Sequence, residues 1–222
     1  MSSNLEEVYH RAMDTVGPVL VANAPLQWTQ ALAAIASAGA PLLAADGGAN
    51  HLARIGLKPL YAIGDFDSIT PETRAWIGDG RLVHRPSQDQ TDLEKALTFA
   101  FDELNLTRLT VLAALGGRDD HTIGNLGLLA RLCFGDHLIF RSDTSLCLAV
   151  TGTHTLPAVP GETWSFWSFD PRIRVTLDGV RWPVHGANLS PAAQPSISNL
   201  ATAPRVRIVA DGGAVIVYRR LR

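Results

Sequence analysis

Two aspartates separated by one residue follow a short apolar segment of the chain. Leu60–Ile63 is typical of a buried strand, and Gly64 ends it before Asp65 and Asp67. Residues i and i+2 of extended backbone point to the same side, so the two carboxylates are expected to project together. Close ionised carboxylates repel unless a cation lies between them, and oxygen ligands of this kind suit Mg²⁺, which often accompanies phosphate. An exposed acidic turn is the alternative for this motif taken alone.

A second acidic motif extends from Gln88 to Lys95. Thr91 and Glu94 have the spacing of a helix capping box, which places Asp92 at the first helical position, where the helix dipole favours negative charge. Asp92 could supply a third carboxylate to a metal, and Lys95 could reach a phosphate oxygen one turn later. A well-capped helix and a solvated lysine are the simpler interpretations.

Two further polar loops follow apolar segments. One is Gly116–His121, in which paired glycines permit a close backbone approach and Arg118 offers a planar fork for phosphate. The other is Asp46–Asn50. Strand ends of a parallel sheet converge on one edge, where open α/β sheets bind ligands. That edge is expected to carry a set of charged residues, namely Asp46, Asp65, Asp67, Asp92, Arg118 and Asp120.

Strand-like and helix-like segments alternate through the first 142 residues. The expected strands are 19–22, 42–45, 60–63, 81–84 and 109–115, and the expected helices are 28–38, 49–55, 93–104 and 122–132. This alternation predicts an α/β fold, with a Rossmann-like, mostly parallel sheet covered by helices on both faces. The chain contains neither a Walker A loop nor a GxGxxG motif after a strand, so nucleotide binding would depend on acidic residues and metal.

After about residue 143 short strands and turn residues replace the helical pattern. The expected strands are 145–150, 164–169, 172–177, 206–209 and 214–218, and the stretch 184–204 shows no periodicity. This pattern predicts a small all-β sandwich. We therefore expect two domains, an α/β domain over 1–142 that carries the expected metal site and a β-sandwich domain over 143–222.

Composition narrows the function classes. A net charge of −2 argues against a nucleic-acid binder, which needs excess basic charge to cover phosphates. Residues 1–17 lack the apolar core of a signal peptide, and the apolar run 31–45 is too broken to span a bilayer. Cys133 and Cys147 lack metal-ligand spacing and are expected to be free thiols. These features favour a cytoplasmic protein with no membrane partner.

Taken together, four motifs resemble the thiamine pyrophosphokinase family. They are AADGGAN (44–50), IGDFDSI (63–69), DQTDLEKAL (89–97) and GGRDDH (116–121), and Gly179–Trp182 and Ser198–Asn199 extend the resemblance. The family transfers a pyrophosphoryl group from ATP to the hydroxyl of thiamine, giving thiamine diphosphate and AMP. The resemblance implies an α/β domain joined to a β-sandwich, Mg²⁺ as cofactor, and a homodimer that binds thiamine where subunits meet.

The resemblance also implies roles for individual residues. Asp65, Asp67 and Asp92 match the family's Mg²⁺ ligands, and Ser198 and Asn199 match the thiamine side. Trp182 is a further candidate there. ATP is expected to contact Asp46, Asn50, Gln88, Thr91, Lys95 and Arg118. Catalysis is assigned to Arg118, which would offset phosphate charge, and to Asp92 and Asp120, either of which could accept the hydroxyl proton.

Three positions depart from the family pattern. Ala22–Pro25 stands where a Gly-rich turn is usual, Ser87 replaces an Asp, and Asp119 replaces an apolar residue. Two alternatives stay open. A phosphatase of the haloacid-dehalogenase type would use Asp65 as nucleophile and Asp67 as acid/base, although that class carries its DxD motif on the first strand. A non-catalytic homologue that only binds thiamine or nucleotide is the other.

Overall fold

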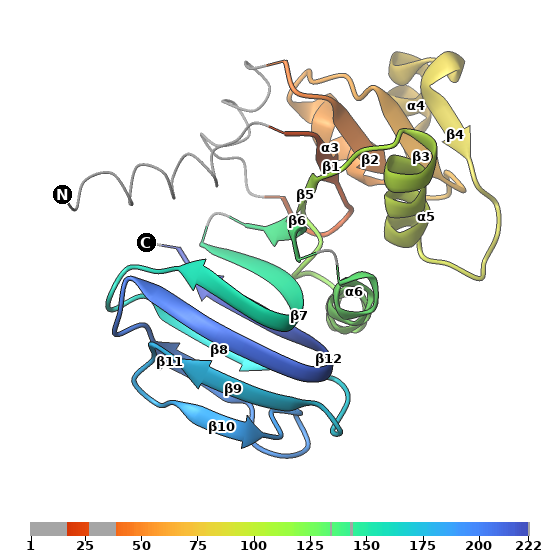
Figure 1. Cartoon of the computed structure of the whole chain (residues 1–222). Coiled ribbons are helices and arrows are strands. Elements are labelled where there is room, and N and C mark those ends of the chain that lie inside the picture. Colours follow the sequence, from red (N-terminus) through yellow and green to blue (C-terminus); the bar gives the residue numbers. More distant parts are fainter. Residues whose placement is uncertain (1–16, 27–38, 134, 143, 222) are drawn as a thin grey trace. The chain divides into compact units, whose positions relative to one another are not determined.

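The structure, a computed structural model, describes residues 17–26, 39–133, 135–142 and 144–221 (Figure 1). The helix expected over 28–38 lies outside these residues. The chain divides into two compact units, one formed by Val16–Leu128 with His137–Asp143 and the other including Leu129–Asp136 and Thr144–Arg222. The domain limits expected from the sequence, 1–142 and 143–222, stay a prediction. Within the described residues no helix is long and apolar enough to cross a bilayer.

The first unit is built on a parallel sheet. Its strands are β1 (Val19–Val21), β2 (Leu42–Ala45), β3 (Tyr61–Gly64), β4 (Leu82–His84), β5 (Leu109–Leu112) and β6 (Gly135–Arg141). They pair in the order β6-β5-β1-β2-β3-β4, and every pairing is parallel. The predicted parallel α/β sheet is confirmed. Because β2 and β5 flank β1, the chain reverses its direction of travel across the sheet at β1, which creates the switch point where such sheets bind ligands.

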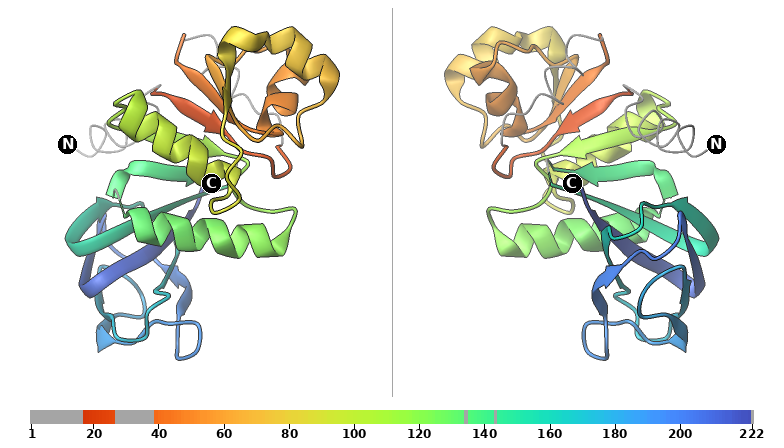
Figure 2. Two further views of the ribbon diagram at one scale, coloured as in Figure 1. Left: turned by 90° about the vertical axis from the view of Figure 1, so that its right-hand side faces the viewer. Right: turned by 90° about the vertical axis from the view of Figure 1, so that its left-hand side faces the viewer.

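Helices cover both faces of this sheet (Figures 1 and 2). Val21 of β1 and Ala44 of β2 belong to one apolar cluster with Leu52 of α3 (Gly48–Arg54) and Ile77 of α4 (Pro71–Ile77). Alternate strand residues point the other way, and there α5 (Asp92–Thr98) contacts β2 and β3. A fourth helix, α6 (Asp119–Leu132), follows β5. Apolar residues on both faces explain the uninterrupted hydrophobic strands of the sequence.

Helix α5 begins as its sequence predicts. The Thr91 hydroxyl accepts a hydrogen bond from the Glu94 N–H at 3.3 Å, and Asp92 occupies the first helical position. The helix continues over Phe99–Glu103 with π-helical geometry. Helix α4 also has a Thr cap, in which the Thr70 hydroxyl accepts from the Thr73 N–H at 3.2 Å. Its short apolar face gave too little periodicity to be predicted.

The second unit consists of strands that form two layers sharing their longest members. The strands are β7 (Ser145–Pro157), β8 (Thr163–Trp167), β9 (Arg174–Asp178), β10 (Val184–Ala187), β11 (Ser196–Leu200) and β12 (Arg205–Arg220). Strand β12 pairs with β7 along its whole length, with β9 over its first half and with β8 over its second half. Its pairing with β7 shifts register between Ala210 and Val215. Figure 2 shows the course of these two strands.

The β-rich second unit is confirmed, with two corrections to its strands. The strands expected at 206–209 and 214–218 are one strand, β12, because the Gly212–Gly213 segment forms an irregularity rather than a reversal of direction. The stretch 184–204 contains β10 and β11, whose half-exposed residues leave little periodic signal. Alternation of burial in β9 shows one covered face and one open face.

A charged pair is buried in the second unit. The Arg219 guanidinium donates to Glu162 Oε2 at 2.7 Å and lies 4.2 Å from the centre of the Trp164 ring. The same oxygen accepts from the Val159 N–H at 3.0 Å and from Trp164 Nε1 at 3.3 Å. Arg219 and Glu162 are only 2% and 8% exposed, so their opposite charges compensate each other where little water reaches them.

We expect Glu162→Ala to lower the free energy of unfolding by about 3–5 kcal/mol, because it leaves the buried Arg219 charge without its carboxylate. Chemical denaturation measures this loss. The matched control is Asp178→Ala, which removes the half-exposed pair with Arg207 and should cost less than about 1 kcal/mol. Equal losses in the two variants would contradict the structural importance of the buried pair.

Candidate active site

A pocket of about 430 Å³ opens at the carboxyl ends of β1, β2, β3 and β5, within the first unit. Its volume falls in the range of small-molecule sites. The walls come from four strand-end loops and from two helices. The loop residues are Ala22–Pro25, Ala45–Asp46, Asp67–Ser68 and Ala113–Arg118 without Leu115, and the helices contribute Thr91–Leu93 at the start of α5 and His121 and Asn125 of α6. The predicted convergence of the four polar loops on one edge is therefore confirmed for the first unit.

Two glycines after β2 let the Asp46 loop pack tightly against the end of β1. A Cβ atom on Gly48 would overlap the carbonyl oxygen of Val21, and one on Gly47 would overlap the Asn23 side chain. Asp46 itself has a φ of 41°, which is uncommon outside glycine. The Asp-Gly-Gly sequence, weak evidence by itself, thus has a steric reason at this position.

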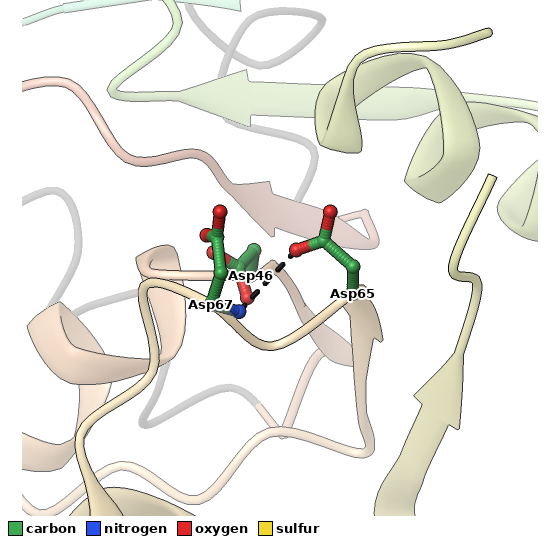
Figure 3. Close-up of side chains that lie close together, drawn as sticks. All are labelled: Asp46, Asp65 and Asp67. Atoms are coloured by element: carbon green, nitrogen blue, oxygen red, sulfur yellow. Dashed lines mark hydrogen bonds between the residues drawn. The ribbon is translucent and has the colours of Figure 1, made fainter. Parts of the chain in front are cut away.

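Asp65 and Asp67 are joined by a turn rather than by extended backbone. Strand β3 ends at Gly64, and Phe66 has a φ of 68°, so the i and i+2 argument from a strand does not apply. The Phe66 ring stacks on His84 and lies under the Arg74 guanidinium. The turn still brings the carboxylates together, because the Asp67 N–H donates to Asp65 Oδ1 at 3.3 Å (Figure 3).

Asp46 is the third member of this carboxylate cluster. One oxygen from each of Asp46, Asp65 and Asp67 lies within 4.8 Å of the others (Figure 3). Asp46 is 2% exposed; its Oδ2 accepts from the Ser68 N–H at 3.1 Å, while its buried Oδ1 has no hydrogen-bond partner among the described residues. Burial raises the pKa of Asp46 above its usual value. A buried carboxylate oxygen without a donor, beside two more carboxylates, fits a divalent cation such as Mg²⁺.

Asp92, the third metal ligand expected from the resemblance, lines the pocket but is not part of that cluster. Its Oδ1 accepts from Lys95 Nζ at 2.9 Å, and the same ammonium lies 3.6 Å from Asp65 Oδ2. Lys95 is 5% exposed, so the solvated lysine considered from the sequence is wrong. Burial alone lowers the pKa of Lys95, but Asp92 and Asp65 outweigh burial and hold that pKa above its usual value.

Gln88 and Asn50, both expected to contact ATP, bind neighbouring loops. Gln88 Nε2 donates to Asp65 Oδ2 at 2.9 Å, and this bond is the largest cause of the lowered pKa of Asp65. The Asn50 amide donates to the Ser68 carbonyl at 2.8 Å and accepts from the Thr70 N–H at 3.1 Å. Asn50 therefore connects α3 to the loop after the aspartate pair. A direct contact of either residue with ATP stays a prediction.

Arg118 and Asp120 form an exposed, two-pronged ion pair. Arg118 Nε donates to Asp120 Oδ1 at 3.1 Å and Nη2 donates to Oδ2 at 2.6 Å. This pair lowers the pKa of Asp120 to about 2 and raises the pKa of Arg118. Asp120 is thus ionised near neutral pH. Arg118 borders the pocket with its fork engaged by a carboxylate, the geometry that it would also offer to a phosphate.

Asn125 is a pocket residue that sequence reasoning missed. It lies on α6, is 7% exposed, and its amide donates to the Ala114 carbonyl at 2.7 Å. This contact fixes the loop after β5 against α6. A polar residue inside the expected helix 122–132 was the available signal, because a buried Asn needs hydrogen-bond partners.

The three residues expected on the thiamine side lie in the second unit. Asn199 is 1% exposed; its Oδ1 accepts from the Trp182 N–H at 3.1 Å, and its Nδ2 donates to the Trp182 carbonyl at 2.8 Å. Ser198 has a φ of 57°, and its N–H donates to the Ser165 hydroxyl at 3.0 Å. Trp182 is 53% exposed. The structure therefore brings these residues together, with Asn199 holding the backbone that presents the Trp182 ring.

Comparison with known proteins places the chain among its relatives. The profile for "Thiamin pyrophosphokinase, catalytic domain" matches residues 34–140. Thiamine pyrophosphokinase 1 of Oryza sativa subsp. japonica is 30% identical over 221 residues, which cover 86% of this chain and 80% of the relative. The chain belongs to the thiamine pyrophosphokinase family. The thiamine pyrophosphokinase of Bacillus subtilis (strain 168) is 29% identical over 168 residues, 69% of this chain and 75% of its own length.

Solved thiamine pyrophosphokinases share the fold. The structure from Bacillus subtilis matches with a TM-score of 0.75 at 25% identity and covers 93% of this chain and 99% of that one. The structure from Candida albicans matches with a TM-score of 0.77 at 17% identity, covering 93% and 90%. The family resemblance read from the four motifs is confirmed, and so is the α/β fold with a β-rich second part.

We expect Gly48→Ala to destabilise this family member by roughly 1–3 kcal/mol, because its methyl group would overlap the Val21 carbonyl and push the Asp46 loop away from β1. Gly48 is helical, and alanine is the better helix former, so a loss can only come from the overlap. Denaturant unfolding gives the value. Gly80→Ala, where a Cβ would meet open space, is the control and should change stability by under about 0.5 kcal/mol. A neutral Gly48→Ala would refute the close approach.

Proposed function

We propose that this protein transfers a pyrophosphoryl group from ATP to the hydroxyl oxygen of thiamine, giving thiamine diphosphate and AMP. The observation that carries the proposal is the cluster of Asp46, Asp65 and Asp67, with a buried carboxylate oxygen lacking a donor, at the strand ends of a family member. Such a cluster suits the cation that accompanies a triphosphate.

Mg²⁺ is the proposed cofactor, held by Asp65 and Asp67 with Asp46 and Asp92 nearby. When bound, it would neutralise the triphosphate and so lower the barrier to attack on the β-phosphorus. The protein's own share is positioning. Gln88 and the Asp67 N–H fix the two oxygens of Asp65, and the Ser68 N–H fixes one oxygen of Asp46. Preorganised groups of this kind stabilise developing charge without reorganising during the reaction.

Arg118 is proposed to offset the charge on the phosphates. Its pairing with Asp120 shows that the guanidinium can bind two oxygens at once at the border of the pocket. The proton of the thiamine hydroxyl would pass to a carboxylate, and Asp92 and Asp120 are the two candidates. Asp92 and Thr91 line the pocket, and Gln88, bound to Asp65, completes the proposed ATP side. A general base must lie within hydrogen-bond reach of the hydroxyl and have a pKa suited to accepting its proton.

For thiamine we propose contacts with Ser198 and with the Trp182 ring, which Asn199 holds in place. The acidic pocket would favour the fixed positive charge of thiamine. The protein is further proposed to act as a homodimer in the cytoplasm, with an α/β catalytic domain over 1–142 and a β domain over 143–222. The dimer is proposed only from the resemblance of the sequence motifs to the family.

The haloacid-dehalogenase alternative has little support in the described residues. A nucleophilic aspartate must face the substrate, whereas Asp65 is not among the residues that line the pocket. The aspartate pair also follows β3, the third strand along the sheet-forming chain, and not the first. Family membership favours the kinase over a phosphatase.

The test is incubation with ATP, Mg²⁺ and thiamine, followed by chromatographic separation of the products. We expect thiamine diphosphate and AMP in equal amounts, formed only when thiamine is present. Chelation of the metal with EDTA should stop the reaction. Inorganic phosphate released without thiamine would favour the phosphatase instead, and binding of both substrates without turnover would identify a non-catalytic homologue.

We expect Asp67→Asn to lower kcat by roughly 100-fold or more, because the amide removes one charge from the proposed metal cluster while keeping the size of the side chain. The unfolding midpoint without metal should stay within a few degrees of the parent. Asp102→Asn is the matched control, since Asp102 is an exposed aspartate outside the cluster, and it should keep parental activity. Full activity of Asp67→Asn would overturn the proposed metal site.

A further inference from the structure

Lys95 is placed differently from a phosphate-binding lysine. The chain has only two lysines, Lys58 and Lys95. Lys58 is exposed, whereas the Lys95 side chain is 4% exposed and projects from α5 toward the carboxylates of the site. Lys95 is not one of the residues that line the pocket, although Asp92, one turn earlier on the same helix, is. Its ammonium contacts carboxylates at the edge of the site.

Those partners belong to two different segments, the first turn of α5 and the loop after β3. Lys95 Nζ donates to Asp92 Oδ1 at 2.9 Å, at the start of α5, and lies 3.6 Å from Asp65 Oδ2, after β3. Gln88 donates to the same oxygen of Asp65 at 2.9 Å. Oδ2 of Asp65 therefore has Gln88 and Lys95 as partners, whereas Oδ1 accepts a hydrogen bond from the Asp67 N–H. The ammonium thus connects the acidic motif after β3 to the acidic motif before α5.

We infer that Lys95 is a positioning residue that serves as a resident counter-cation of the acidic site. It bridges Asp65 and Asp92, so that the two acidic motifs are assembled before a divalent cation arrives. This inference deepens the proposed function and rests on it for the identity of the cation site. It replaces the expectation that Lys95 contacts a phosphate of ATP.

The charges near the strand ends give the physical reason. Asp46, Asp65, Asp67 and Asp92 supply up to four negative charges, and one buried ammonium is adjacent to two of them. Like charges at such distances repel, more strongly where water is excluded. Without Lys95 the loops would depend on an added cation to stay together. With it, binding of Mg²⁺ need not be coupled to assembly of the site.

The test compares Lys95→Met with Lys58→Met in thermal unfolding, without nucleotide, in EDTA and in saturating Mg²⁺. In EDTA, Lys95→Met should unfold on the order of 5 °C below Lys58→Met, because two partly buried carboxylates lose their cationic partner. The increase in the unfolding midpoint on adding Mg²⁺ should be at least twice as large for Lys95→Met as for Lys58→Met. A purely structural lysine would lower both midpoints of the variant equally.

A second variant keeps the test decisive if Lys95→Met folds poorly. Lys95→Met combined with Asp92→Asn removes one charge of each sign, so relief of repulsion should recover at least half of the midpoint lost in EDTA. If the double variant is as unstable as the single one, Lys95 acts by packing and the inference is wrong. Equal midpoints in EDTA together with a weaker affinity for ATP would assign Lys95 to a phosphate instead.

The outcome is separable from that of the proposed function. If Mg²⁺ shifts no variant, the parent included, the proposed cation site falls. The midpoints of the single and double variants in EDTA would then still decide whether Lys95 offsets carboxylate repulsion. If the parent makes thiamine diphosphate but Lys95→Met shows no added dependence on Mg²⁺, the function stands and the counter-cation inference fails.

Discussion

Mutual repulsion among carboxylates is the constraint that the first unit must satisfy. Parallel strands deliver Asp46, Asp65 and Asp67 to one edge of the sheet, within 4.8 Å of one another, and α5 adds Asp92 beside them. Most of the polar contacts at this edge oppose that repulsion. Backbone N–H groups donate to Asp46 and Asp65, and the Lys95 ammonium connects Asp65 to Asp92. The surrounding loops are shaped by the need to hold these charges close.

That constraint explains why the loops are sterically tight. The Asp46 loop can approach β1 only because Gly48 lacks a side chain, and Asp46 and Phe66 both have positive φ values that most residues avoid. A strained backbone conformation of this kind persists only where contacts with the surrounding structure hold it in place. The stacking of Phe66 on His84 is one such surrounding contact. Rigidity in these loops keeps the carboxylates from separating.

The sequence was most informative where one periodicity or one spacing decides the structure. Apolar runs located β2 and β5, and the spacing of Thr91 and Glu94 located the start of α5. Four polar loops were assigned to one sheet edge because parallel strands permit no other arrangement. The role of Asn125 and the turn at Phe66 were not predicted, because each depends on contacts between different segments of the chain. The single long strand β12 was predicted as two strands, because paired glycines can indicate either an irregularity within a strand or a turn between two strands.

The order in which the pocket walls occur along the chain has a consequence for synthesis. The residues that line the pocket extend along the chain from Ala22 to Asn125. Strand β5, which precedes the loop carrying Gly116, pairs with β1 although it is synthesised much later. A nascent chain therefore cannot hold substrate until about half of it has left the ribosome. Until then β1 has an unpaired edge, which in growing chains invites wrong partners. The pairing of β1 with β5 is therefore completed late in synthesis, after most of the other strands of the first unit exist.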